Sequence, residues 1–203
     1  MSLTEPFCPR LIAHRGGGFD APENTIAAFD MAKRHNYQML ECDVKLSADG
    51  VPYLLHDSTL DRTTSASPTD CGLFSVDEEL GGIPCGDQTW NTLSQLDAGS
   101  WYGDGERFEG EKIPTLEEVA NWCIENDVDI NLEIKPVPGT ERETGKVVAQ
   151  YVESLWENSD RKPLLTSFSL DAIEEVKREA PSLRKGVLFE TFPDGYFHHR
   201  LRH

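Results

Sequence analysis

Short apolar runs alternate along this chain with segments whose apolar residues recur at helical spacing. The apolar runs are RLIAH (10–14), MLECDVKLS (39–47), VPYLLHD (51–57), DINLEIKP (129–136), LLTSF (164–168) and KGVLFE (185–190). Helical spacing begins near Asn24, resumes at a Thr115–Glu118 capping-box pattern, and recurs over 147–155 and 173–176. Strands that alternate with helices are typical of parallel sheets with crossover helices. The sequence therefore predicts an α/β fold.

The alternation stops between Ser58 and Ile113, where Gly, Ser, Thr, Pro and Asp are frequent. A structureless loop of this length is uncommon in a compact domain. One helix-like piece, WNTLSQLDAGSWY (90–102), offers apolar side chains for packing. A chain of 203 residues can bury a sizeable core. We therefore expect residues 1–203 to form a single domain with a small inserted lobe at about 58–113. The alternative is a solvated acidic excursion of the surface.

The charge of the chain limits its partners. It carries 36 acidic and 19 basic residues, a formal net charge of −17, which repels nucleic acid and anionic membrane surfaces. We therefore expect no nucleic-acid or membrane partner, and any anionic substrate needs a local cation. The five cysteines show no C-x-x-C spacing, which argues against a zinc site and a disulfide framework. With no leader pattern and no apolar run of about 18 residues, we expect a cytoplasmic location.

Two predicted strands carry their ionisable residues on one face. Side chains alternate along a strand, which groups Glu41, Asp43 and Lys45 in LECDVKL, and Asn131, Glu133 and Lys135 in INLEIKP. A half-exposed antiparallel strand would show the same alternation. In a parallel sheet covered on both sides, however, three converging carboxylates need a counter-charge. Their oxygens suit a hard cation such as magnesium or calcium.

His14 and His56 each stand at the end of a predicted strand. His14 opens the stretch HRGGG (14–18). The glycines either form an ordinary surface turn or let the backbone approach a bound anion, with Arg15 pairing its charge and His14 moving a proton. A lone histidine at a strand end is commonly structural. Two histidines beside the ends of the carboxylate strands favour a general acid and a general base that act in one reaction.

Four longer motifs occur in a family-specific order. They are AHRGGGFDAPENTIAAF, ECDVKLSADGVPYLLHDSTLDRTT, LDAGSWY and NLEIKP. Over residues 10 to 190 the chain resembles the glycerophosphodiester phosphodiesterase family, and in particular its short cytoplasmic bacterial type. The resemblance implies a distorted TIM (β/α) barrel with a small insertion after the His-Asp segment. In such barrels the site lies at the carboxyl ends of the strands.

The resemblance also implies a role for each candidate residue. Glu41, Asp43 and Glu133 would bind one divalent cation, Mg²⁺ or Ca²⁺, and two cationic residues, Arg15 and Lys135, would contact phosphate oxygens. The acid and base would be His14 and His56. The implied reaction is metal-dependent hydrolysis of a small glycerophosphodiester to glycerol 3-phosphate and an alcohol. The alternatives are a lysophospholipase D-like phosphodiesterase and an inactive remnant that binds without turnover.

The chain departs from the family pattern near its C-terminus. We count six candidate barrel strands, whereas the resembled barrel has eight. We therefore expect a barrel that is incomplete at the C-terminus, with Leu11 and Ile12 lacking a strand neighbour and with marginal stability. The last residues, from His198 to His203, are basic and show no apolar period. The oligomeric state is not determined by the sequence.

Overall fold

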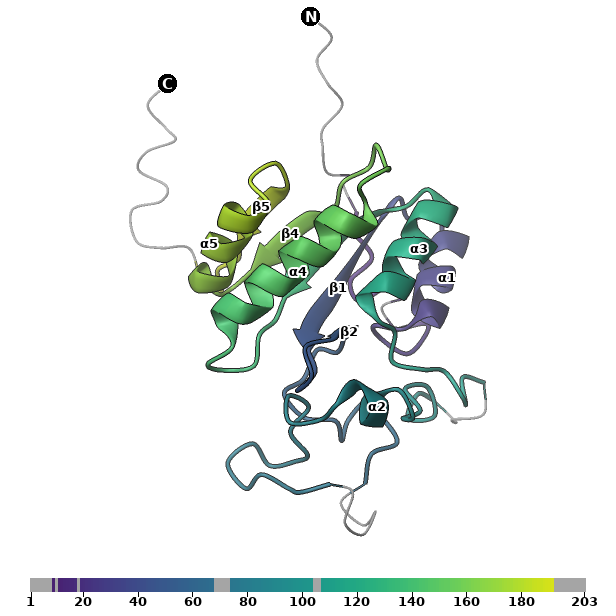
Figure 1. Cartoon of the computed structure of the whole chain (residues 1–203). Coiled ribbons are helices and arrows are strands. Elements are labelled where there is room, and N and C mark those ends of the chain that lie inside the picture. The colour runs from purple at the N-terminus through teal and green to yellow at the C-terminus, as the bar shows by residue number, and fades with distance from the viewer. Residues whose placement is uncertain (1–8, 10, 18, 68–73, 104–106, 192–203) are drawn as a thin grey trace, which may run out of the picture.

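Four parallel strands form the centre of the molecule in a computed structural model that describes residues 9, 11–17, 19–67, 74–103 and 107–191 (Figure 1). They are β1 (Met39–Leu46), β3 (Asp129–Ile134), β4 (Leu164–Ser167) and β5 (Arg184–Val187). A further strand, β2 (Pro52–Leu54), lies antiparallel to β1, and the sheet order is β2-β1-β3-β4-β5. The predicted parallel sheet is confirmed.

Helices cover one face of this sheet (Figure 1). They are α1 (Ile26–Arg34), α3 (Leu116–Asn126), α4 (Glu141–Leu155) and α5 (Leu170–Glu179). One apolar cluster joins these helices to alternate side chains of β1 and β3. The other side chains of the two strands, including the carboxylates, face the opposite side. This arrangement confirms the expected α/β fold of the TIM-barrel type. Within the described residues the sheet is open, with β2 and β5 at its edges.

Polar caps fix where two of the helices begin. The Thr115 hydroxyl accepts the Glu118 N–H at 3.1 Å, and the Glu118 carboxylate accepts the Thr115 N–H at 2.7 Å, so the predicted capping box before α3 is confirmed. The Thr25 hydroxyl accepts the Ala28 N–H at 3.2 Å and caps α1. The α1 helix therefore begins after Thr25, close to the predicted start.

The α4 helix is longer than the predicted segment 147–155. It begins at Glu141, where the sequence has no apolar period. A Cβ atom on Gly145 would lie 2.3 Å from the Ala172 carbonyl oxygen, so a glycine is needed for α4 and α5 to approach so closely. The first turns of α4 pack through backbone proximity rather than through large apolar side chains, which explains why periodicity missed them.

Two predicted strands take another form. RLIAH supplies one isolated parallel bridge between Ala13 and Leu40, and Leu11 is 69% exposed. VPYLLHD contains the antiparallel β2 because the chain reverses at Gly50, whose φ of 81° is a conformation that favours glycine. The expectation of six barrel strands is therefore wrong. The described residues hold four parallel strands and the bridge at Ala13.

The helix-like piece at 90–102 forms only the short α2 (Trp90–Leu93). Beyond it, the Asp97 carboxylate accepts the N–H groups of Gly99 and Ser100 at 2.7 Å each. A Cβ atom on Gly99 would lie 1.9 Å from the Phe108 carbonyl oxygen. This carboxylate-fixed turn and the close backbone contact exclude a longer helix here.

The segment between β2 and α3 packs around an apolar cluster of its own. Its buried members are Tyr53, Leu55, Leu60, Ala66, Ile83, Cys85, Leu93, Leu96, Ala98 and Ile113. This packing supports the interpretation of residues 58–113, called the lobe segment below, as an inserted lobe of one domain. That division of the chain stays a prediction.

Some of the sequence predictions concern residues that the structure does not describe. Cys8, Cys71 and the basic tail within 192–203 lie outside the described residues. The described cysteines, which are Cys42, Cys85 and Cys123, are free and buried. No helix in the described part of the chain is both long enough and apolar enough to cross a membrane.

Candidate active site

Three carboxylates meet on the face of the sheet that the helices leave uncovered. The parallel register places Asp43 of β1 beside Glu133 of β3, and Glu41 lies two residues before Asp43 on the same face. One carboxylate oxygen from each residue lies within 4.8 Å of the other two. The structure therefore brings together the three predicted metal ligands, called the carboxylate cluster below.

Two of the three residues in the carboxylate cluster are buried, Glu133 is partly buried, and the negative charge of the cluster is not fully balanced. Glu41 is 8% exposed and Asp43 is 1% exposed. Burial raises the pKa of Glu41 to about 7, with a further contribution from the charges of Asp43 and Glu133. The buried Oε1 of Glu41 has no hydrogen-bond partner among the described residues, and the Oε1 of Glu133 has only an ion pair with Lys135. Oxygen ligands left without partners fit a hard divalent cation.

The two predicted phosphate-binding residues lie against this cluster. Arg15 Nε is 3.5 Å from Asp43 Oδ2, and Lys135 Nζ is 3.3 Å from Asp43 Oδ1. Lys135 Nζ also lies 3.4 Å from Glu133 Oε1. Both side chains can offer N–H donors to a phosphate oxygen at the edge of the cluster. Lys45, predicted to share this face, is 2% exposed, and burial lowers its pKa.

The HRGGG turn packs tightly on α1. Gly16 has a φ of 86°, and a Cβ atom there would lie 2.7 Å from the ring of Phe29. The same turn directs the backbone N–H of Arg15 to Glu41 Oε2 at 3.0 Å. The described glycines therefore do permit a close turn, and this turn holds Arg15 and one carboxylate together.

The two histidines have different surroundings. His14 Nε2 lies 3.8 Å from Glu41 Oε2, and its side chain is 71% exposed. Partial burial and the charge of Arg15 lower the pKa of His14, which favours the neutral ring, the form that can accept a proton. His56 Nδ1 lies 2.7 Å from Asp57 Oδ1. The Leu55 N–H donates to the Asp43 carbonyl at 3.2 Å, which places His56 beside the carboxyl half of β1.

Sequence reasoning gave no site role to Asn24. Its side chain is 4% exposed and makes two hydrogen bonds to Asp43: its amide NH₂ donates to Oδ2 at 2.9 Å, and its amide oxygen accepts the backbone N–H at 3.1 Å. Its φ of 58° is unusual for a residue other than glycine but is tolerated by asparagine. No periodicity marks such a residue. The only sequence signal is a polar residue just before the cap of α1.

Three more charged residues near the histidines were also missed. Arg62, in the lobe segment, donates to both Glu23 and Asp57. These residues lie in loops, where neither helical nor strand spacing indicates that side chains converge. The motifs APENT and HDSTLDR contain them, but the motifs alone do not show their contacts.

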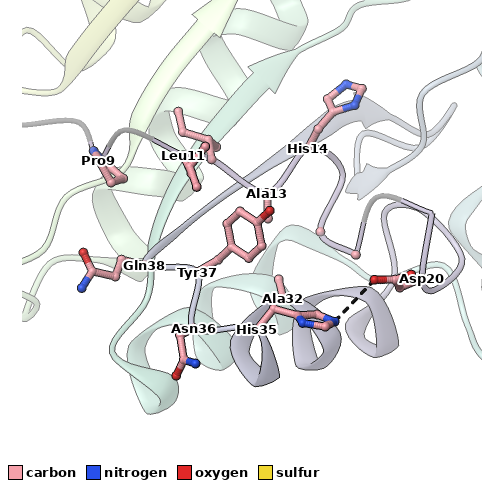
Figure 2. Close-up of a pocket in the computed structure, with 13 residues that line it drawn as sticks. Pro9, Leu11, Ala13, His14, Asp20, Ala32, His35, Asn36, Tyr37 and Gln38 are labelled. Atoms are coloured by element: carbon pink, nitrogen blue, oxygen red, sulfur yellow. Dashed lines mark ion pairs between the residues drawn. The ribbon is translucent and has the colours of Figure 1, made fainter.

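A separate hollow of about 730 Å³ lies between the segment 9–17 and the C-terminal part of α1 (Figure 2). Figure 2 shows the Tyr37 ring beneath Ala13, and an ion pair of 3.4 Å between His35 and Asp20 at one side. The residues that line the hollow include His14 but none of the three carboxylates. The candidate active site is therefore not this hollow.

Comparison with known proteins identifies the family. Residues 14–198 match the model of the glycerophosphoryl diester phosphodiesterase family. The chain belongs to this family. The resemblance that the motifs indicated is thereby confirmed.

Members of the family with known names and structures support the assignment. The chain is 35% identical to a glycerophosphodiester phosphodiesterase of Caldanaerobacter subterraneus over 89% of its length. It is 36% identical to a putative glycerophosphodiester phosphodiesterase of Bacillus subtilis over 88% of its length. It spans 66% and 65% of these two relatives, respectively.

Solved structures of the family share the fold. A phosphodiesterase of Oleispira antarctica, in complex with the product sn-glycerol-3-phosphate, matches with a TM-score of 0.79 and 32% identity, over 95% of this chain and 70% of that one. A glycerophosphodiester phosphodiesterase of Agrobacterium tumefaciens matches with a TM-score of 0.68 and 32% identity, over 86% of this chain and 64% of that one.

Proposed function

We propose that the protein hydrolyses glycerophosphodiesters to glycerol 3-phosphate and an alcohol, with one bound Mg²⁺ or Ca²⁺. The observation that carries this proposal is the carboxylate cluster, in which buried oxygens lack hydrogen-bond partners. The cationic side chains of Arg15 and Lys135 and the ring of His14 lie at its edge. The activity named for the relatives, and the product bound in the Oleispira antarctica enzyme, support the same substrate class.

In this proposal Glu41, Asp43 and Glu133 hold the divalent cation. Held there, a divalent cation would supply positive charge to the phosphate oxygens of the substrate. Arg15 and Lys135 now pair with Asp43, and both would donate to phosphate oxygens when the substrate is present. The net charge of −17 makes these local cations necessary for an anionic substrate, and it disfavours nucleic acid.

The two histidines carry the proton transfers. One accepts the proton of the attacking hydroxyl as the new P–O bond forms, and the other gives a proton to the alcohol oxygen as the old P–O bond breaks. The attacking hydroxyl is either that of a water molecule or the hydroxyl on the neighbouring carbon of the glycerol. In the second case the attack forms a cyclic phosphate, which water then hydrolyses. The neutral ring of His14 and the carboxylate-bound ring of His56 both suit proton exchange.

A lysophospholipid is the second candidate substrate. It is favoured by three exposed apolar side chains at or beyond the carboxyl ends of β4 and β5, which are Phe168 (50%), Leu170 (61%) and Phe189 (54%). Asp43 and Glu133 lie in the carboxyl halves of β1 and β3, so these apolar side chains lie toward the same end of the sheet as that part of the carboxylate cluster. Comparing turnover of glycerophosphocholine with that of lysophosphatidylcholine separates the two substrates.

The decisive experiment measures release of glycerol 3-phosphate from glycerophosphocholine with Mg²⁺, with Ca²⁺ and with a chelator. We expect release with at least one cation and none with the chelator. Loss of release in Asp43→Asn and its retention in Asp129→Asn would tie the activity to the carboxylate cluster, because Asp129 starts β3 outside the cluster. Binding of glycerol 3-phosphate without turnover of any diester would instead identify a binding protein and contradict the proposal.

A further inference from the structure

Arg62 joins two carboxylates that come from different parts of the chain. Its Nη1 and Nη2 donate to the two oxygens of Glu23 at 2.8 and 2.7 Å. Its Nε and Nη2 donate to the two oxygens of Asp57 at 2.5 and 3.0 Å. One guanidinium therefore makes a two-point contact with each carboxylate, the geometry in which arginine differs most from lysine.

Each of these carboxylates also contacts a residue of the proposed active site. Glu23 Oε1 accepts Arg15 Nη1 at 2.8 Å. Asp57 Oδ1 lies 2.7 Å from His56 Nδ1. The five side chains form one continuous chain of contacts, Arg15–Glu23–Arg62–Asp57–His56, called the arginine network below. Arg62 is its centre, and it belongs to the lobe segment.

The arginine network holds in place the carboxylate that the His56 ring contacts. Arg62 donates to both oxygens of Asp57, which fixes the orientation of this group against the His56 ring. The same hydrogen bonds lower the pKa of Asp57 to about 2, and at neutral pH the group is a carboxylate. A carboxylate accepts hydrogen bonds and cannot donate them. The proton between the two groups therefore resides on His56 Nδ1. The neutral ring then has its lone pair on Nε2, which is the nitrogen available for proton exchange.

The lobe segment also supports Arg62 from its other side. The guanidinium carbon of Arg62 lies 5.9 Å from the ring centroid of Trp101, within the range of a cation–π contact. Trp101 in turn donates its indole N–H to the Ala98 carbonyl at 2.8 Å, in the turn fixed by Asp97. The folded lobe segment therefore helps to position Arg62, together with Glu23 and Asp57.

We propose that Arg62 is a positioning residue that holds His56 in its Nδ1-protonated tautomer and restrains Arg15, so that the lobe segment organises the active site. The part that concerns turnover rests on the proposed function. The part that concerns the His56 tautomer does not, because it follows from the contacts that Arg62 and His56 make with Asp57.

The test compares Arg62→Met and Arg62→Lys with Arg161→Met in the full chain. Arg161 is a matched control because it also contacts two carboxylates, Asp127 at 2.7 Å and Asp129 at 2.9 Å, but lies away from the candidate site. The first measurement is the ¹⁵N chemical shifts of the histidine rings above their titration range, with His56 assigned through its absence in His56→Gln. The second is kcat and KM for glycerophosphocholine.

We expect Arg62→Met to shift the His56 ring toward a mixture of tautomers and to lower kcat by about 10- to 100-fold, the usual effect of losing a partner that orients a functional side chain. Arg62→Lys keeps the charge but not the two-point contacts, so an intermediate kcat is expected. Arg161→Met should leave the ring shifts and kcat within about twofold of the unmodified protein.

Three results would overturn the proposal. One is an unchanged His56 tautomer in both Arg62 variants. Another is a kcat within twofold of the unmodified protein in Arg62→Met. The last is an equal loss in Arg161→Met, because it would show a general effect on the fold. If the unmodified protein shows no diesterase activity, the proposed function fails, and the tautomer measurement still decides whether Arg62 positions His56.

Discussion

The carboxylate cluster and the arginine network lie in one site, but they shift the pKa values of their carboxylates in opposite directions. In the cluster, burial and neighbouring carboxylates raise the pKa of Glu41 to about 7. In the network, the arginines lower the pKa of Glu23 and Asp57. The cluster is built by neighbouring strands of a sheet, whereas the network is built by loops and by the lobe segment.

This difference separates two uses of a carboxylate. Buried carboxylates without enough counter-charge destabilise the folded protein when no cation is bound. They are therefore suited to bind a cation from solution. Carboxylates that an arginine already neutralises gain nothing from a cation, and they serve to orient the groups they contact. We therefore propose that the cluster holds the cation and that the network orients the groups it contacts. The four predictions that follow test this division.

The largest effect is expected from the centre of the carboxylate cluster. Asp43→Asn keeps the size of the side chain but removes one ligand charge. We expect Mg²⁺ affinity to fall and kcat/KM to decrease by about 10³-fold or more, which corresponds to about 4 kcal/mol. Calorimetric titration and glycerol 3-phosphate release measure the two quantities. Asp129→Asn is the control, and unchanged Mg²⁺ affinity in Asp43→Asn would contradict the assignment.

The histidines should affect turnover without affecting the cation. His14→Ala and His56→Ala are each expected to lower kcat by about 10²- to 10⁴-fold, the usual size of a proton-transfer contribution. Mg²⁺ affinity should remain near that of the unmodified protein. His35→Ala is the control, because His35 pairs with Asp20 beside the separate hollow.

A substrate whose leaving group needs no proton separates the two roles. It should restore turnover in the variant that has lost the general acid and not in the other. Near-normal kcat in either histidine variant on glycerophosphocholine would remove that histidine from the mechanism.

The two groups of carboxylates should also respond to pH in opposite directions in the metal-free protein. The pKa of Glu41 rises from 4.5 to about 7 on folding, so the unfolded chain releases this proton first. The contribution of Glu41 to the free energy of unfolding therefore falls between about pH 4.5 and 7, by about 3 kcal/mol in total. Glu23 has a lowered pKa, so its stabilising contribution is present above pH 4.5 and is lost as the pH falls.

Urea unfolding in a chelator, at pH values from 4 to 8, measures these slopes. We expect Glu41→Gln to remove much of the decline between pH 4.5 and 7, and added Mg²⁺ to oppose that decline because it binds the ionised cluster. Equal slopes in Glu41→Gln and the unmodified protein would show that Glu41 does not titrate in this range.

A smaller effect is expected from Asn24, which orients Asp43 without joining either group. Asn24→Gly keeps the left-handed backbone conformation accessible and removes both hydrogen bonds to Asp43. Mg²⁺ affinity should fall by about 10- to 100-fold. Asn36→Gly is the control, because Asn36 has a similar φ of 62° and lies outside the site. The prediction fails if both variants bind Mg²⁺ equally well.

The sequence predicts the carboxylate cluster better than the arginine network, for a physical reason. Residues two apart on a strand share a face, so periodicity places Glu41 and Asp43 together and gives β3 an ionisable face of its own. The pairing of β1 with β3 then brings Glu133 beside Asp43. Their roles stay a prediction. Asn24 and Arg62 act from loops, where the conformation depends on contacts such as those of Asp97 and Trp101 that no short-range pattern encodes.

Errors in the fold prediction have a similar origin. The apolar run VPYLLHD was expected to be a barrel strand, but the turn at Gly50 folds it back against β1. The start of α4 was missed because Gly145 packs through its lack of a side chain. In both places the structure depends on a backbone conformation or a close backbone contact that a glycine permits. Hydrophobic periodicity describes only the pattern of side chains and does not detect either.

The parallel pairing of β1 with β3 also has a kinetic consequence. Asp43 and Lys135 are 92 positions apart, and the lobe segment lies between them. The cluster cannot form until β3 has been synthesised and has found its register, so the site is assembled late compared with the local β1–β2 hairpin. Closure entropy grows only logarithmically with loop length, about 0.6 kcal/mol per doubling. The length of chain between the two strands is therefore free to vary among relatives with little thermodynamic penalty. Each added residue nevertheless delays the moment at which a nascent chain can assemble the carboxylate cluster.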